Sequence, residues 1–121
     1  RPRSSMSPSL VFNQDGSLFA AVGSPGGSRI IGYVTKSMIG LMDWKLSMQE
    51  AVNLPHFINR NGKTDLEKGT SLAGLGAKLE AMGHRVRVRS LNSGLHGIRV
   101  TADGLDGGAD RRREGTVIHL P

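Results

Sequence analysis

Short apolar runs separated by turn residues organise the first thirty positions of the chain. Residues 10–12 and 18–22 are two such runs, and Asp15-Gly16 between them is a hairpin signal. Neither run alternates cleanly between apolar and polar residues, which is typical of strands that are covered on both faces. We therefore predict an antiparallel strand pair that ends at the glycine-rich segment 23–27.

Two helices are predicted after that segment. Apolar residues recur there at four-residue spacing, namely Ile30, Val34, Met38 and Met42. This spacing predicts a helix with Ser28 as its N-cap that runs to about Trp44. Ser47 and Glu50 then have the spacing of a capping box, so a short helix should begin there and end before Pro55.

The rest of the chain combines one helix with several strands. Four apolar residues fall on one face of a predicted helix over 72–82, and Gly83 is placed to end that helix. Residues 105–115 are rich in Gly, Asp and Arg and are predicted to form a loop. Strands are predicted at 64–67, 84–90, 97–101 and 116–120. Packing helices on a sheet buries these elements, which predicts an α+β or layered α/β fold.

The composition excludes several classes of protein. The chain has 121 residues, which fits one domain spanning 1–121. It contains no cysteine, so disulfides and thiolate metal sites are excluded. No apolar run approaches the roughly 20 residues that a membrane span needs, so we expect no membrane span.

The positive charge raises the question of nucleic-acid binding. The formal net charge is +6. Arg85, Arg87 and Arg89 alternate with valines, as residues on the wet face of a strand do. No aromatic side chains lie between these arginines to stack on bases. We therefore favour a solvated basic surface over a nucleic-acid partner.

The segment 23–28, Gly-Ser-Pro-Gly-Gly-Ser, joins a predicted strand to a predicted helix. Adjacent glycines let a ligand approach the backbone closely, and the start of a helix supplies unpaired N–H groups with partial positive charge. Such a turn suits a phosphate, a carboxylate or a developing oxyanion. A tight turn without a ligand is the other interpretation, and the spacing matches no nucleotide-binding motif.

Ser4 and Ser5 form a second feature, just before the first predicted strand. Two adjacent hydroxyls can hold a carboxylate by hydrogen bonding. On their own, adjacent serines near a proline are more often ordinary loop residues. Their interpretation therefore depends on what else the chain contains.

Metal and acid–base chemistry find no support in the spacing of the polar residues. The four histidines lack metal-ligand spacing. The acidic residues near the C-terminus lack the order of a calcium-binding EF-hand loop: Asp103, Asp106, Asp110 and Glu114. We predict no metal site and find no Ser-His-Asp pattern.

The serine pair and the glycine segment are far more specific together than apart. Residues 2–8, Pro-Arg-Ser-Ser-Met-Ser-Pro, then a short hairpin, then 23–31, resemble the signature of the γ-glutamyltransferase family. The resemblance continues at 49–52, 79–84 and 107–115. It therefore extends over nearly the whole chain in the family's order.

This resemblance implies an N-terminal nucleophile hydrolase fold, an αββα sandwich, with residues 1–121 as the C-terminal part of the small catalytic subunit. In that family a precursor cleaves itself, and the new N-terminal Thr attacks the γ-glutamyl amide of a substrate such as glutathione. The resulting γ-glutamyl-enzyme passes its acyl group to water or an acceptor amine. The resemblance implies no cofactor, and it favours a periplasmic or secreted protein.

The same resemblance assigns four residues. Ser4 and Ser5 would bind the α-carboxylate of the γ-glutamyl group, and the N–H groups of Gly26 and Gly27 would form the oxyanion hole. No threonine of the chain has the context of the family's nucleophile, which should lie upstream. We therefore expect the isolated chain to be inactive on γ-glutamyl-p-nitroanilide. Its expected partners are the remainder of the small subunit and the large subunit, or a second copy of itself.

Two departures from the family pattern and three alternatives complete the prediction. The usual Asp-Pro-Arg lacks its proline at 110–112, and 92–96 replaces a Gly-Ser-rich stretch. Both departures are predicted to affect loop details only, away from the four assigned residues. The alternatives are a relative of the cephalosporin acylases, a non-catalytic remnant or interaction module of the same family, and a basic nucleic-acid-binding domain.

Overall fold

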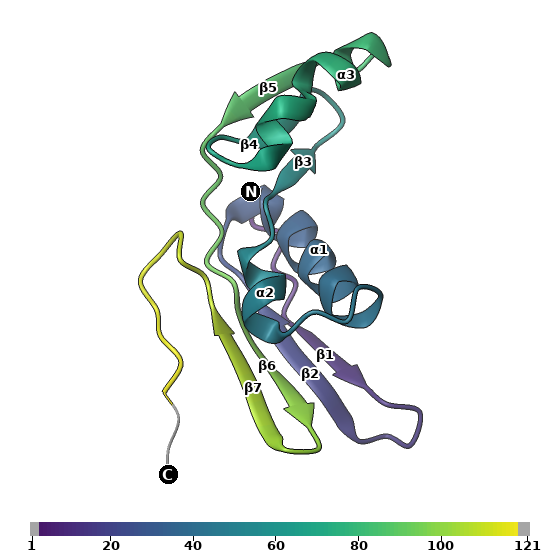
Figure 1. Cartoon of the computed structure of the whole chain (residues 1–121), viewed down its shortest axis with the longest axis vertical. Coiled ribbons are helices and arrows are strands. Elements are labelled where there is room, and N and C mark those ends of the chain that lie inside the picture. The colour runs from purple at the N-terminus through teal and green to yellow at the C-terminus, as the bar shows by residue number, and fades with distance from the viewer. Residues whose placement is uncertain (1–2, 119–121) are drawn as a thin grey trace. The chain divides into compact units, whose positions relative to one another are not determined.

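The first two apolar runs form the antiparallel pair that their turn predicts. In the computed structural model, which describes residues 3–118, β1 (Ser9–Phe12) pairs with β2 (Leu18–Gly23). The sheet continues with β6 (His96–Thr101) and β7 (Gly104–Ala109) in the order β1-β2-β6-β7 (Figure 1). Every neighbouring pair in it is antiparallel. This sheet is the frame of the larger of two units, which contains the described residues up to Leu54 and from Ser93 onward.

Two helices pack on one face of this sheet. The single 3₁₀ turn η1 (Gly27–Arg29) leads into α1 (Ile30–Met42), and α2 (Met48–Asn53) follows. Helix α2 contacts β6 and β7, and α1 contacts α2 and β2 (Figure 1). The core between the two layers contains apolar side chains from the sheet and both helices: Ala20, Val22, Tyr33, Leu41, Met48, Ala51 and Val52.

The strand β7 corrects the prediction of a loop over 105–115. Its Gly108 lies so close to α2 that an added Cβ would be 2.8 Å from the backbone oxygen of Met48. Gly97, the partner of Gly108 on β6, also approaches Met48. The glycines that indicated a loop are therefore the residues that let a helix pack closely on a strand.

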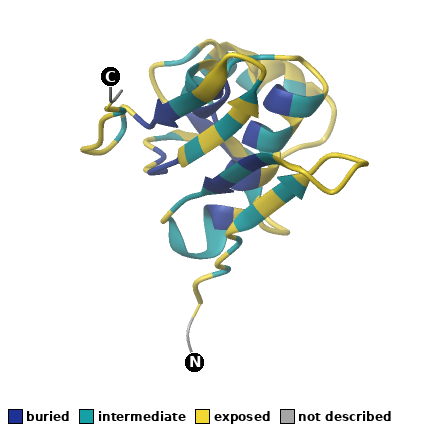
Figure 2. Ribbon diagram, turned by 90° about the horizontal axis from the view of Figure 1, so that it is seen from below, coloured by how far each residue is buried: buried dark blue, intermediate teal, exposed yellow. Residues whose placement is uncertain are grey.

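The opposite face of the sheet is exposed among the described residues. Large apolar side chains on three of the four strands are exposed, and burial alternates along two of these strands, β1 and β6, as the ribbon colouring shows (Figure 2). They are Leu10, Phe12, Ile98, Val100 and Leu105, with Leu10 64% and Ile98 49% exposed. The prediction that residues 10–12 are covered on both faces is therefore wrong within residues 3–118, where α1 and α2 cover one face of the sheet and Leu10 stays exposed on the other.

The smaller unit, Pro55–Asn92, contains a separate three-stranded sheet. Strand β4 (Thr64–Glu67) lies between β3 (Phe57–Asn59), which is antiparallel to it, and β5 (Val86–Arg89), which is parallel. The connection between β4 and β5 contains η2 (Ser71–Leu75) and α3 (Gly76–Ala81). Strand β3 was not predicted from the sequence, and the predicted helix over 72–82 is half 3₁₀ turn and half α-helix.

Local signals at the ends of the helices had mixed outcomes. The capping box is confirmed: the Ser47 N–H donates to Glu50 Oε2 (2.8 Å) and the Glu50 N–H donates to Ser47 Oγ (3.3 Å). Ser28 is not the N-cap of α1, because η1 places it inside a 3₁₀ turn and Arg29 at the cap. Gly83 has a φ of 91°, as the prediction for the end of the helix requires.

Two predictions about strands also need correction. Residues 116–118 form no strand, and the rest of the predicted strand 116–120 lies outside the described residues. The arginines around β5 do not define a purely wet face, because Arg87 pairs with the buried Asp65 while Val88 is 45% exposed.

Candidate functional site

The fold brings the two sequence motifs of the site into contact. The Ser5 N–H donates to the backbone oxygen of Gly27 (3.1 Å), because Ser5 precedes β1 and Gly27 follows β2, and the hairpin brings these two segments to the same end. The Ser7 hydroxyl donates to the Ser5 carbonyl (3.0 Å), which orders the same segment. Ser4 is exposed and Ser5 is half-buried. The roles of these serines and of the two glycines stay predictions, but their proximity is observed.

The glycine turn, residues 24–28, has a backbone that only glycine adopts easily. Gly26 has φ 142° and ψ 10°, and Gly27 has φ 62°. The ring of Tyr33 covers Gly26 so closely that an added Cβ would be 2.7 Å from Tyr33 Cε2. Among the described residues, the N–H groups of Gly26 and Gly27 have no backbone acceptor. The Tyr33 ring therefore packs against the turn, and the N–H groups of Gly26 and Gly27 are available as donors at the start of a helix.

The segment before β6 supports the glycine turn. The Gly94 N–H donates to Ser24 Oγ (3.1 Å), and the Ser24 hydroxyl donates to the Pro25 carbonyl (2.8 Å). Gly94 also lies against Pro25, because an added Cβ would be 2.7 Å from Pro25 Cγ. The prediction that 92–96 affects only loop details, away from the four assigned residues, stays untested, but this stretch does contact Ser24 and Pro25, the two residues before Gly26.

A buried carboxylate organises that supporting segment. Asp110 is 1% exposed and accepts hydrogen bonds from the Ser93 hydroxyl, the Leu95 N–H (3.1 Å), the Arg112 N–H (2.9 Å) and the Arg112 guanidinium (3.0 Å). Burial raises the pKa of Asp110, but these donors and the charge of Arg112 outweigh burial, so the pKa lies below its usual value. The carboxylate therefore stays ionised inside the protein.

Sequence reasoning missed this role of Asp110, which it rejected as a calcium ligand and otherwise noted only in the departure from the family's Asp-Pro-Arg. An acidic residue followed two positions later by arginine was the available signal. The signal is weak without the fold, because Ser93 and Leu95 are brought to Asp110 by the pairing of β6 with β7. The missing proline at 110–112 leaves this network intact.

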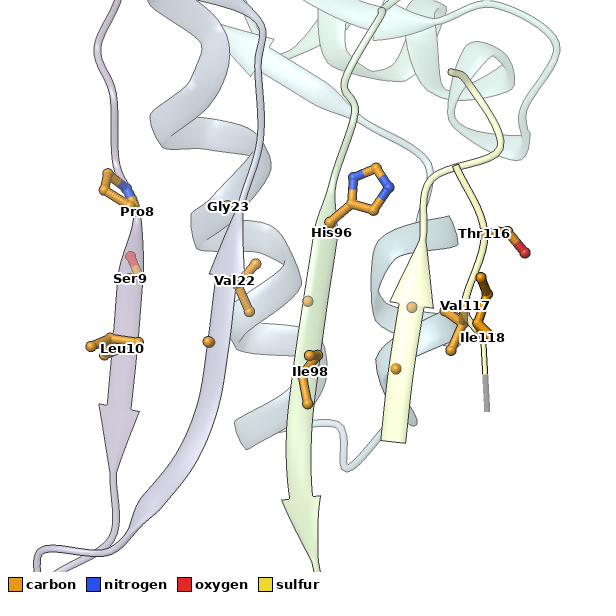
Figure 3. A pocket seen from close by; sticks show the side chains of 14 residues that line it. Pro8, Ser9, Leu10, Val22, Gly23, His96, Ile98, Thr116, Val117 and Ile118 are labelled. Atoms are coloured by element: carbon orange, nitrogen blue, oxygen red, sulfur yellow. The ribbon is translucent and has the colours of Figure 1, made fainter. Parts of the chain in front are cut away.

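A long groove lies on the exposed face of the sheet. Its volume is 710 Å³, and its lining is mainly apolar (Figure 3). Leu10 and Ile98 line it from β1 and β6, and Val117 lines it from the segment after β7. His96 lies at one end, where its Nδ1 is 3.1 Å from the Gly94 carbonyl oxygen. The groove contains few polar groups, so it suits packing against another apolar layer better than binding a small polar substrate.

The histidines form no cluster in the described part of the chain. His56 is buried, and His84 and His96 lie in different units, while His119 falls outside the described residues. Within residues 3–118, no three histidine or acidic side chains are arranged as metal ligands would be. Among the helices of this range, none is both long enough and apolar enough to cross a membrane.

Comparison with known sequences gives one consistent result. A family model described as Gamma-glutamyltranspeptidase matches residues 1–120. The glutathione hydrolase proenzyme of Escherichia coli K12 is 40% identical over 115 residues, which cover 93% of this chain and 20% of that protein. The acylase ACY 1 proenzyme of Pseudomonas sp. strain SE83 is 34% identical over 119 residues, with 96% and 21% covered. The chain thus spans about a fifth of the length of these relatives.

Solved structures show the same relationship. The gamma-glutamyltranspeptidase of Pseudomonas nitroreducens complexed with L-DON aligns with a TM-score of 0.86 and 28% identity, covering 98% of this chain and 63% of that one. The T380A mutant of the Helicobacter pylori enzyme aligns with a TM-score of 0.82 and 31% identity, covering 93% and 63%. These neighbours are N-terminal nucleophile hydrolases, so the predicted fold class is confirmed, with this chain as part of the fold.

Proposed function

This chain belongs to the gamma-glutamyltranspeptidase family, and from that premise we propose that it supplies part of an active site that cleaves γ-glutamyl amides. In this proposal Ser4 and Ser5 bind the α-carboxylate of the γ-glutamyl group. The N–H groups of Gly26 and Gly27 stabilise the oxyanion that develops on the attacked carbonyl. Glutathione is the proposed donor, and water or an amine is the proposed acceptor.

The observation that carries this proposal is the hydrogen bond from the Ser5 N–H to the Gly27 carbonyl (3.1 Å). A γ-glutamyl group has a carboxylate at one end and the reacting carbonyl at the other, a few bonds apart. A substrate of this kind needs a carboxylate site and an oxyanion site side by side. Direct contact between the serine segment and the glycine turn meets that requirement.

The nucleophile is proposed to come from outside these 121 residues. A threonine that uses its own α-amine as the base becomes N-terminal when the precursor cleaves itself, and none of the five threonines here has the sequence context of the family's nucleophile. In the described residues they also lie on different elements, with Thr64 buried in β4 and Thr35 exposed on α1. The isolated chain should therefore show no turnover of γ-glutamyl-p-nitroanilide, and clear turnover by it would refute this part of the proposal.

An acylase of the cephalosporin type is the second candidate. The 34% identity to the acylase ACY 1 proenzyme favours it. The two candidates differ in whether the acyl group of the substrate has an α-amino group in addition to its carboxylate. A glutaryl amide keeps the carboxylate and lacks the α-amino group, so a γ-glutamyl enzyme should prefer the γ-glutamyl amide of the same leaving group. Preference for the glutaryl amide would instead support the acylase.

The proposed partners are the remainder of the small subunit and the large subunit. The exposed sheet face with Leu10 and Ile98 should pack against apolar surface that these segments provide. In their absence the chain should self-associate through this face. Light scattering of the wild-type chain and of an Ile98→Thr variant tests this, because the variant should associate less. A wild-type chain that remains a monomer at high concentration would contradict the expectation.

The decisive test of the proposed function uses a full-length protein that contains this chain. Its turnover of γ-glutamyl-p-nitroanilide should be measured for the wild type and for Gly26→Ala. The added methyl group would lie 2.7 Å from Tyr33 Cε2, so the turn and its N–H donors should be displaced and kcat should fall by about 10²-fold or more. No γ-glutamyl turnover by the correctly processed wild type would favour the non-catalytic alternative.

A further inference from the structure

We infer that Asp110 is a positioning residue for the glycine turn, acting through the segment before β6. This inference rests on the proposed function for what the turn does. It adds that the geometry of the two donors at Gly26 and Gly27 depends on a buried carboxylate that does not touch the substrate. The chain of contacts from Asp110 to the turn has three steps.

In the first step, Asp110 is hydrogen-bonded to residues 93–95. Its Oδ2 accepts from both the Ser93 hydroxyl and the Leu95 N–H. Ser93 and Leu95 are themselves buried, with 0% exposure each. Two bonds from one oxygen to residues on either side of Gly94 fix the backbone position of Gly94.

The second step runs from Gly94 to the glycine turn. The Gly94 N–H donates to Ser24 Oγ (3.1 Å), and its α-carbon packs against the Pro25 ring. Pro25 immediately precedes Gly26, and its ring permits little rotation about φ. A displacement of Gly94 by a few tenths of an ångström should therefore displace the backbone of Gly26 by a similar distance.

The third step anchors the other side of the carboxylate. Asp110 Oδ1 accepts from the Arg112 N–H and guanidinium, and this guanidinium also donates to the carbonyls of Val52 (3.2 Å) and Leu54 (3.0 Å). These carbonyls belong to the C-terminal end of α2 and the residue after it. Arg112 thus fixes Asp110 relative to α2. If residues 93–95 move, Asp110 does not move with them.

The chemistry of this site requires a carboxylate. All four groups that face Asp110 are donors, so an acceptor-only side chain satisfies each of them. An asparagine has nearly the same shape, but its NH₂ group would face donors on one side whichever way the amide turned. Asp110→Asn therefore releases either residues 93–95 or Arg112 with little change in volume.

The experiment compares Asp110→Asn with a matched control, Asp65→Asn, in a full-length protein that contains this chain. Asp65 is also buried, at 2% exposure, and is paired with Arg87 (2.8 Å), but it belongs to the smaller unit, whereas the glycine turn belongs to the larger one. Turnover of γ-glutamyl-p-nitroanilide is normalised to active sites counted from the acyl-enzyme burst. Backbone hydrogen exchange of peptides covering 24–28 is measured in parallel.

Asp110→Asn should lower kcat per active site by roughly tenfold to a hundredfold with a smaller change in KM, because misplaced donors weaken oxyanion stabilisation. Exchange over 24–28 should accelerate in the same variant. Asp65→Asn should lose stability without either change. Equal kcat per active site in Asp110→Asn and Asp65→Asn would overturn the inference while leaving the proposed function intact.

An inactive wild type would contradict the proposed function. The positioning role of Asp110 would then be tested by the hydrogen-exchange measurement alone. Accelerated exchange over 24–28 in Asp110→Asn, but not in Asp65→Asn, would still support control of the turn by Asp110. Unchanged exchange in both variants would overturn it. If Asp110→Asn fails to fold, Ser93→Ala removes one of the four donors and should give a smaller effect of the same kind.

Discussion

Replacing Gly26 by alanine tests whether the glycine turn is shaped as the structure indicates. Two separate costs arise at this position. The backbone has φ 142°, a region that alanine adopts with strain, and the new Cβ would lie 2.7 Å from Tyr33 Cε2 and 3.1 Å from Cδ2. Neither cost can be relieved by a simple rotation, because Tyr33 is fully buried.

The magnitude follows from these two costs. An unfavourable φ/ψ combination costs about 1–3 kcal/mol, and overpacking a well-packed site costs about 1–3 kcal/mol. Together they predict that Gly26→Ala lowers the free energy of unfolding by about 2–6 kcal/mol. Gly27→Ala is the matched control, because Gly27 has φ 62° and nothing within 4 Å of an added Cβ. It should cost about 1–2 kcal/mol.

Urea unfolding followed by circular dichroism measures both variants. A double-mutant cycle with Tyr33→Leu then isolates the contact, because the smaller side chain makes room for the new methyl group. The cost of Gly26→Ala should fall by about 1 kcal/mol or more in the Tyr33→Leu background. The reasoning is refuted if Gly26→Ala costs no more than Gly27→Ala, or if the two substitutions at 26 and 33 are additive.

Three further predictions concern the rest of the larger unit. Gln49→Ala should destabilise by about 2–4 kcal/mol in urea unfolding, because the Gln49 side chain both donates to and accepts from the backbone of the buried Ala109 (3.0 and 3.1 Å). Gly108→Ala should destabilise by about 1–3 kcal/mol because it collides with α2, whereas Gly62→Ala, with open space around it, should change the unfolding free energy little. Folding lowers the pKa of Asp110, so the ionised carboxylate stabilises the folded state fully at pH values above the pKa of the unfolded chain. The free energy of unfolding should therefore fall as the pH drops below about 4 and approaches the pKa of Asp110 in the folded protein. A pH titration of unfolding should show a weaker acid dependence in Asp110→Asn.

Local signals predicted much of the fold, and tertiary packing decided the rest. The hairpin turn and the Ser47–Glu50 capping box depend on neighbours in sequence, and both are present. Strand β7 was predicted as a loop because its glycines and aspartate disfavour strands in general. Its conformation is instead set by pairing with β6 and by the close approach of α2, and neither is visible in residues 104–109 alone.

The candidate site divides in a similar way. The serine pair and the glycine turn are contiguous motifs, so the sequence contained them completely, and the fold adds the Ser5–Gly27 hydrogen bond that joins them. Asp110 could not be assigned in this way, because its partners at 93–95 reach it only after β6 and β7 have paired. Its importance follows from burial and from four donors, which are properties of the fold.

The central claim is that Ser4 and Ser5 hold the substrate carboxylate beside an oxyanion site at Gly26 and Gly27. Its most direct test is kcat/KM of a full-length protein containing this chain, wild type and Ser4→Ala/Ser5→Ala, on two anilides. One is γ-glutamyl-p-nitroanilide, and the other is its 4-aminobutyryl analogue, which lacks the α-carboxylate. The double variant should lose about 10²-fold on the γ-glutamyl substrate, since two hydrogen bonds to a charged group are removed, and almost nothing on the analogue. An equal loss on both substrates, or no loss on the first, would contradict the claim.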